Sequence, residues 1–208
     1  MNDKIGYIAL SIIMTLILIG FGVKIIRKTV KEERRKKTTA FLILGLISWH
    51  LYMYFIGESG ILMTYDLPPR FPLFLVAPAF LFIGIFAWKS KNKAWLDEVS
   101  IPFIILYQSF RIAVESLFVA SVAIGVLHSN VTVEGYNYDM LFGFSALLVY
   151  LLYRLKKQAA LKWVLYWNYF GLLVIAFIIF LFTTTTYVPS FYGSTEYLMP
   201  LEFTTFPY

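Results

Sequence analysis

Six long apolar stretches, separated by short polar or charged segments, dominate the pattern of the 208-residue chain. A helix needs about 20 mostly apolar residues to cross the hydrocarbon core of a bilayer. Each stretch approaches or exceeds that length. The pattern therefore predicts an all-α fold, a polytopic transmembrane helical bundle that forms a single transmembrane domain over residues 1–208. The predicted spans are residues 5–26, 39–63, 71–88, 101–127, 138–154 and 164–187.

Composition agrees with this pattern and limits the kinds of site that the chain can form. Apolar residues make up 60% of the chain and charged residues 14%, whereas a soluble domain has roughly 45–50% and 25%. The chain contains no cysteine and only two histidines, which excludes disulfides, thiolate metal sites and a cysteine nucleophile. No hydrolase elbow, phosphate loop or metal-ligand spacing occurs. We therefore expect no metal, no cofactor and no catalytic residues. An enzyme is accordingly the less favoured class of protein.

Basic residues concentrate in alternate loops between the predicted spans. Of the 18 lysines and arginines, eight lie in the first loop, three in the third and four in the fifth. The positive-inside rule places these loops in the cytoplasm and both termini outside. The expected partners are the lipid bilayer and anionic lipid headgroups at the cytoplasmic loops. We expect no nucleic acid partner, because the loops are too short to fold a recognition module.

The fourth predicted span carries polar residues that are costly in hydrocarbon. Gln108, Arg111 and Glu115 share one helical face, and Arg111 and Glu115 are spaced for a direct ion pair. One interpretation is an ion, proton or substrate site that faces the bundle interior, and the other is a structural clamp. His50, in the second span, is either a proton-relay partner for Glu115 or a buried imidazole bonded to a tyrosine.

A second group of polar residues lies on the predicted outer face. We expect Asp66 to pair with Arg70, Asn137 or Asp139 to cap the fifth span, and Gly135 to adopt a positive φ. The group forms either an external vestibule for a polar solute or simply the loops and caps. Its members are Glu58, Asp66, Arg70, Glu134, Asn137 and Asp139.

The C-terminal segment, residues 188–208, is unusually aromatic for a free tail. Three interpretations fit its composition. It is an external aromatic tail at the membrane interface, a lead-in to a further span missing from this sequence, or a segment that docks on a partner.

Two motifs carry a family resemblance. Phe110-Arg111 with Val114-Glu115, followed by Glu134-Gly135, Asn137 and Asp139, resembles an uncharacterised family of bacterial multi-spanning membrane proteins. In that family a Phe-Arg-x-x-Val-Glu helix precedes a Phe-Glu-Gly-x-Asn-x-Asp loop, and Val133 stands here in place of the phenylalanine. The resemblance implies a bacterial cytoplasmic (inner) membrane and a further span after residue 208, but no activity.

Three functions remain open from the sequence. The first is binding or transport of a small solute or ion through an intramembrane Arg111–Glu115 site, with Gln108 and His50, open to the acidic outer face. The second is a non-enzymatic structural or accessory subunit, as a homo-oligomer or with a partner membrane protein. The third is a membrane-embedded enzyme that acts on lipid, with His50 and Glu115 as its acid and base.

Overall fold

The computed structural model describes residues 2–91 and 93–208, and its regular elements in this part of the chain are all helical. The prediction of an all-α fold is confirmed. The α-helices are α1 (Asn2–Thr29), α2 (Glu32–Glu58), α3 (Ala77–Ser90), α4 (Ile101–Tyr107), α5 (Phe110–Ala123), α6 (Asp139–Lys156) and α7 (Gln158–Tyr187). A π-helical turn, η1 (Pro72–Val76), leads into α3. The 3-10 turns are η2 (Ala94–Glu98), η3 (Ser129–Val131), η4 (Pro189–Tyr192) and η5 (Leu201–Thr204).

Five helical segments of the described chain are long and apolar enough to cross a membrane. They are Lys4–Thr29, Glu32–Glu58, Pro72–Ser90, Ile101–Ala123 and Ala159–Tyr187. The predicted span over residues 138–154 corresponds to α6, an 18-residue helix that contains Asp139, Arg154 and Lys156 and is not among the five. The second span begins earlier than predicted, at Glu32, because Glu32 and Glu33 occupy the first turn of α2, where the helix dipole favours carboxylates.

The fourth span is interrupted rather than continuous. Ser100 caps its start, because its side chain accepts a hydrogen bond of 3.4 Å from the backbone N–H of Phe103. The helix then breaks between Tyr107 and Phe110, where backbone bonds tighten to the i→i+3 pattern at Gln108 and Ser109. The predicted span over 101–127 is present as Ile101–Ala123, which is long and apolar enough to cross a membrane, but it contains this tight turn and ends at Ala123. Such a tight turn within a helix often marks a functional hinge or strain.

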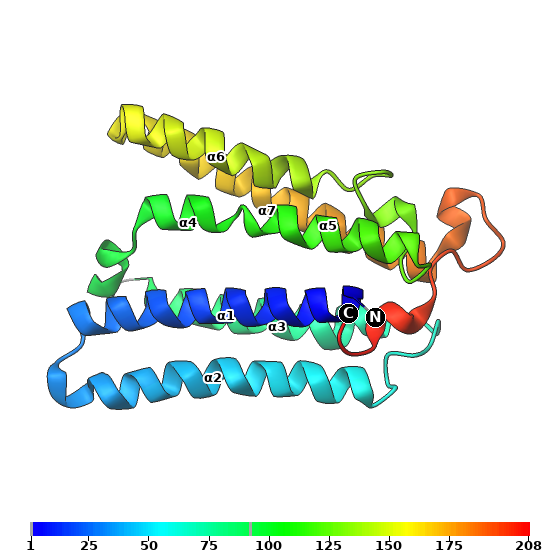
Figure 1. The fold of residues 1–208 in the computed structure, drawn as a ribbon, viewed down its shortest axis with the longest axis horizontal. Coiled ribbons are helices and arrows are strands. Elements are labelled where there is room, and N and C mark those ends of the chain that lie inside the picture. Colours follow the sequence, from blue (N-terminus) through cyan, green and yellow to red (C-terminus); the bar gives the residue numbers. More distant parts are fainter. Residues whose placement is uncertain (1, 92) are drawn as a thin grey trace.

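The helices run along a common direction (Figure 1). The α1–α2 corner, the α3–α4 connection with η2 and the α6–α7 corner lie at one end of the bundle. Both termini, the α2–α3 connection and the α5–α6 loop lie at the other (Figure 1). The three groups of loop lysines and arginines therefore share one end of the molecule. Below we call it the basic end, and the opposite one the terminal end.

Burial differs from that of a soluble protein along much of the bundle. Large apolar side chains face outward, among them Phe82 at 65% exposure, Leu148 at 69% and Leu173 at 67%. By contrast, the buried residues of α5 are Arg111, Glu115 and Ser121, all polar. A water-soluble domain buries apolar residues and exposes charged ones. This arrangement suits a chain surrounded by lipid.

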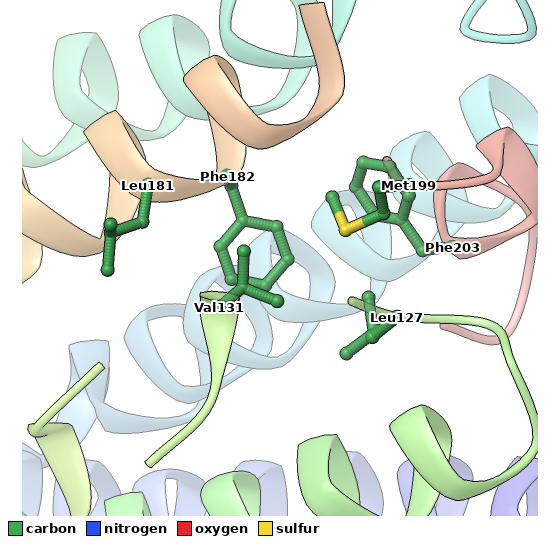
Figure 2. Close-up of a cluster of buried hydrophobic side chains, with 6 residues drawn as sticks. All are labelled: Leu127, Val131, Leu181, Phe182, Met199 and Phe203. Carbon is green, nitrogen blue, oxygen red and sulfur yellow. The ribbon is translucent and has the colours of Figure 1, made fainter. Parts of the chain in front are cut away.

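An apolar core closes the terminal end of the bundle (Figure 2). Its buried residues come from the loop after α5, the end of α7 and the C-terminal segment: Leu127, Val131, Leu181, Phe182, Met199 and Phe203. Tyr65, from the α2–α3 connection, donates a hydrogen bond of 3.0 Å to the Met199 carbonyl and stacks on Tyr197. Residues 188–208 thus pack back onto their own bundle, an arrangement that composition alone did not suggest.

Candidate functional site

Arg111 forms a buried ion pair, but with a different partner from the one predicted. Its Nη1 donates to the carboxylate of Asp139, the first residue of α6, and its Nε donates to Gln108 Oε1 at 3.0 Å. Within residues 2–91 and 93–208 the ion pairs are Arg111–Asp139 and Lys28–Glu98. The expected Arg111–Glu115 pair is therefore wrong. The carboxylate that neutralises Arg111 comes from the next helix instead of from the next turn.

Glu115 binds the loop that joins α5 to α6. Its Oε1 accepts a hydrogen bond of 2.5 Å from the backbone N–H of Val133, and its Oε2 accepts one of 2.9 Å from Asn137 Nδ2. Asn137 Nδ2 also donates to the Val131 carbonyl at 3.0 Å, and Asn137 Oδ1 accepts from the N–H of Asp139 at 3.0 Å. The N-cap residue of α6 is Tyr138, which makes no side-chain cap bond, so the predicted cap by Asn137 or Asp139 is wrong in position. Asn137, one residue earlier, still satisfies the first N–H of α6 and ties it to Glu115.

The loop over residues 124–138 folds into the protein. Val131 and Thr132 have no exposed surface, and Asn137 is 1% exposed. Irregular backbone is tolerated at membrane depth only where its polar groups are satisfied within the protein. The loop meets that condition through its own turns, such as Asn137 N–H to the Thr132 carbonyl at 3.0 Å, and through Glu115.

Gly135 is needed for close packing and not for the positive φ that we predicted. The glycines with positive φ in the described chain are Gly60, Gly125 and Gly193. A Cβ at Gly135 would lie 2.4 Å from the carbonyl oxygen of Ser129, closer than any real contact. The turn of the loop therefore requires a residue without a side chain.

Aromatic rings enclose the Arg111 guanidinium on the α6–α7 side. The guanidinium lies 4.9 Å from the centre of the Phe142 ring, within the range of a cation–π contact. Phe142 stacks on Trp167 of α7 with ring centres 4.6 Å apart. Arg111, Glu115, Asn137 and Asp139 are between 1% and 7% exposed. Their polar side-chain atoms are satisfied by one another and by the loop, so the cluster acts as a clamp that joins α5, α6 and the loop.

His50 lies apart from this clamp. It is exposed on α2, and its Nε2 makes a 2.7 Å hydrogen bond with Thr15 Oγ1 on α1. Its partner is therefore neither a tyrosine nor Glu115, so both predicted pairings are wrong.

The predicted outer vestibule does not form one site. Glu58, Asp66 and Glu134 are exposed, whereas Asn137 and Asp139 belong to the buried clamp. Arg70 Nη1 donates to the Ile61 carbonyl at 3.0 Å, and the Asp66 carboxylate accepts from Thr64 Oγ1 at 2.6 Å. The expected Asp66–Arg70 pair is therefore wrong.

An apolar crevice lies between α1, α2 and α5. Its volume is about 660 Å³, and residues 204–208 close it at the terminal end. A second cavity of about 440 Å³, between α2, α3, α5 and α7, shares five wall residues with the first: Tyr7, Trp49, Met53, Leu75 and Tyr208. His50, Thr15 and Ser11 supply polar atoms along the crevice. In the described part of the chain, neither cavity is lined by a lysine, arginine, aspartate or glutamate.

Sequence reasoning identified the clamp residues but divided them into two sites. The two motifs behind the family resemblance meet in space, because Arg111 and Glu115 contact Asp139 and Asn137. The crevice was missed. Thr15, Trp49 and Met53 form parts of its wall, and their types are ordinary for membrane helices.

No protein-family model, curated protein or solved structure matches this chain.

Proposed function

We propose that the chain is an integral membrane protein with six spans, α6 included, whose basic end faces the cytoplasm and whose termini lie outside. The gathering of the basic loops at one end of the bundle (Figure 1) supports this orientation, because basic loops are retained on the cytoplasmic side. The family resemblance supports a bacterial inner membrane. Pairing of Asp139 with Arg111 supports a membrane position for α6, because the pair neutralises the charge at the start of that helix.

Within the membrane, the function that the geometry supports best is the binding of a small lipid-soluble molecule in the crevice. The observation that carries this proposal is the crevice itself. Its volume of about 660 Å³ falls within the roughly 300–1,000 Å³ of small-molecule sites. It lies between spans, so a ligand dissolved in the bilayer reaches it without crossing water.

The lining of the crevice favours a neutral ligand with one hydrogen-bonding group. A charged ligand would need an opposite charge in this apolar environment, and charged side chains line neither cavity in the described chain. His50 bonds Thr15 through Nε2 and lines the crevice, so we expect its Nδ1 to be available to a ligand. A hydrogen-bonding ligand would stabilise this imidazole nitrogen, since lipid offers no hydrogen-bonding partner.

This proposal moves the binding site from Arg111 and Glu115 to His50. The clamp residues are buried, and they line neither the crevice nor the second cavity. A solute that bound to Arg111 or Glu115 would have to break bonds that hold the α5–α6 loop. We therefore assign the clamp a structural role and the crevice the binding role.

A photoreactive probe tests the proposal. We would label the full chain in lipid nanodiscs with a long-chain alcohol that carries a diazirine, and then map the labelled peptides. We expect labelling around Trp49 and Met53 that excess unlabelled alcohol suppresses. Ser11→Phe fills the crevice and should reduce this labelling several-fold. Ile13→Phe is the matched control, because Ile13 is 53% exposed and lies outside the lining of the crevice.

Labelling spread evenly over outward-facing residues, without competition, would contradict the proposal. An equal effect of Ser11→Phe and Ile13→Phe would also contradict it.

A further inference from the structure

We propose that the α1–α2 corner at the basic end binds the phosphate headgroup of an anionic phospholipid. Eight basic residues fall within residues 24–37. They are Lys24, Arg27, Lys28, Lys31, Arg34, Arg35, Lys36 and Lys37. The inference rests on the proposed membrane position of the bundle and is independent of the ligand in the crevice.

The corner brings these charges close together. Only Val30 and Lys31 separate α1 from α2. Hydrogen bonds of 2.9 Å hold the turn, among them those from Val30 N–H to the Ile26 carbonyl and from Arg35 Nε to the Val30 carbonyl. Basic side chains from the end of one helix and the start of the next therefore surround a single tight turn.

Most of this positive charge is not neutralised by the protein. In the described part of the chain, Lys28 is the only one of the eight that forms an ion pair, with Glu98 at 2.9 Å. The acidic residues within the corner are Glu32 and Glu33, in the first turn of α2, where the helix N-terminus already stabilises them. The other basic side chains are exposed, except for the partly buried Arg35.

The surface next to the corner indicates a lipid rather than a soluble anion. Phe41 and Leu44 follow along α2 and are 66% and 58% exposed. A phospholipid at this position would place its phosphate among the basic side chains and its acyl chains along these residues. Basic residues beside a span attract anionic lipid in this way, and the apolar surface would add nothing to the binding of free phosphate.

The α6–α7 corner provides a matched comparison within the same chain. It carries Arg154, Lys156, Lys157 and Lys162 at the same end of the bundle. Arg154, Lys156 and Lys162 can be changed together, as can Arg34, Lys31 and Lys36. Each set removes one arginine and two lysines, all exposed, so the total charge lost is identical.

The test is native mass spectrometry of the delipidated full chain in detergent, titrated with dioleoyl phosphatidylglycerol or dioleoyl phosphatidylcholine. We expect the wild-type protein to retain phosphatidylglycerol preferentially. The variant Lys31→Gln/Arg34→Gln/Lys36→Gln should bind it about tenfold more weakly or worse. The variant Arg154→Gln/Lys156→Gln/Lys162→Gln should change binding less than threefold, and both should keep the wild-type circular dichroism.

Three results would overturn the proposal. Equal losses in the two triple variants would show attraction to total charge, without a site at the α1–α2 corner. Equal retention of the two lipids would remove the headgroup preference. Displacement of the lipid by an equal concentration of glycerol phosphate would show that phosphate alone is recognised. The crevice is tested with a neutral probe, so neither result of that labelling experiment bears on the lipid site at the α1–α2 corner.

Discussion

The two sides of the bundle pack their helices differently. On one side, which we call the clamped half, α5, α6 and the loop over 124–138 bury Arg111, Glu115, Asn137 and Asp139 in one hydrogen-bonded cluster. On the other side, the open half made of α1, α2 and α3, α2 buries no residue and α3 buries only Ser90. The crevice lies where the open half faces α5.

This difference follows from the properties of lipid as the solvent around the helices. Between helices in lipid there is little hydrophobic driving force, so close packing depends on van der Waals fit and polar contacts. The clamped half has both, including Gly143 packed against Ile112 and Arg111. The open half has few polar contacts between helices, such as His50 with Thr15 and Tyr52 with the Phe74 carbonyl. We infer that the clamped half is the rigid scaffold and the open half the part able to adjust to a ligand.

The largest expected effect comes from breaking the buried ion pair. Arg111→Met leaves the Asp139 carboxylate buried without its partner, which should lower the free energy of unfolding by about 3–5 kcal/mol. Lys28→Met is the control. It breaks an ion pair whose side chains are 53% and 43% exposed, and exposed pairs contribute roughly 0–1 kcal/mol. Unfolding in mixed detergent micelles, followed by circular dichroism, measures both.

A double variant separates the charge from the packing. Arg111→Met/Asp139→Leu removes both charges, so it should be more stable than Arg111→Met alone. If Arg111→Met and Lys28→Met destabilise the protein equally, the clamped half is not held by its buried pair.

A smaller effect should come from adding one methyl group to each half. In Gly143→Ala the new Cβ would lie 2.9 Å from Ile112 Cγ1 and 3.2 Å from the Ile112 backbone nitrogen. The helices must move apart, and we expect a loss of about 1–3 kcal/mol. Gly45→Ala places its methyl in open space on α2 and should be neutral or stabilise by up to about 1 kcal/mol. The same unfolding assay compares them, and equal effects would mean that α5 and α6 are not closely packed.

Much of the fold could be predicted from the sequence, because lipid solvation leaves a strong signal. Runs of apolar residues located the helices, and the alternation of basic loops anticipated that they would share one end of the bundle. The break between Tyr107 and Phe110 could not be anticipated, because it depends on local hydrogen bonds that a hydrophobic pattern does not record. The closing of the terminal end by Met199 and Phe203 depends on contacts distant in sequence.

The candidate site was predicted only in part, for a similar reason. Intramembrane charge alone singled out Arg111 and Glu115. The spacing of four residues then favoured a pair within the helix, whereas Asp139 lies 28 residues away in sequence. The fold of the α5–α6 loop had to be known before Asp139 could be identified as the partner of Arg111. The crevice has no such signal, because empty space is defined by the relative positions of helices.

The smallest expected effect concerns the C-terminal segment, which links the halves through Tyr65. Tyr65→Phe removes the hydrogen bond to the Met199 carbonyl and should loosen the segment by about 0.5–1.5 kcal/mol. Burial raises the pKa of Tyr65 above its usual 10.0, and the Glu202 carboxylate raises it further. The stabilisation is therefore complete below pH 10 and is lost as the pH rises through the higher pKa of the folded protein.

The chain has no cysteine, so a spin label on Glu196→Cys reports the mobility of the segment. At pH 8 the label should move faster in Tyr65→Phe than in the control Tyr138→Phe, whose tyrosine is 55% exposed. As the pH rises above 10 the wild-type protein should approach Tyr65→Phe, and a difference that stays constant up to the pH at which the fold itself is lost would show that Tyr65 does not couple the segment to the bundle.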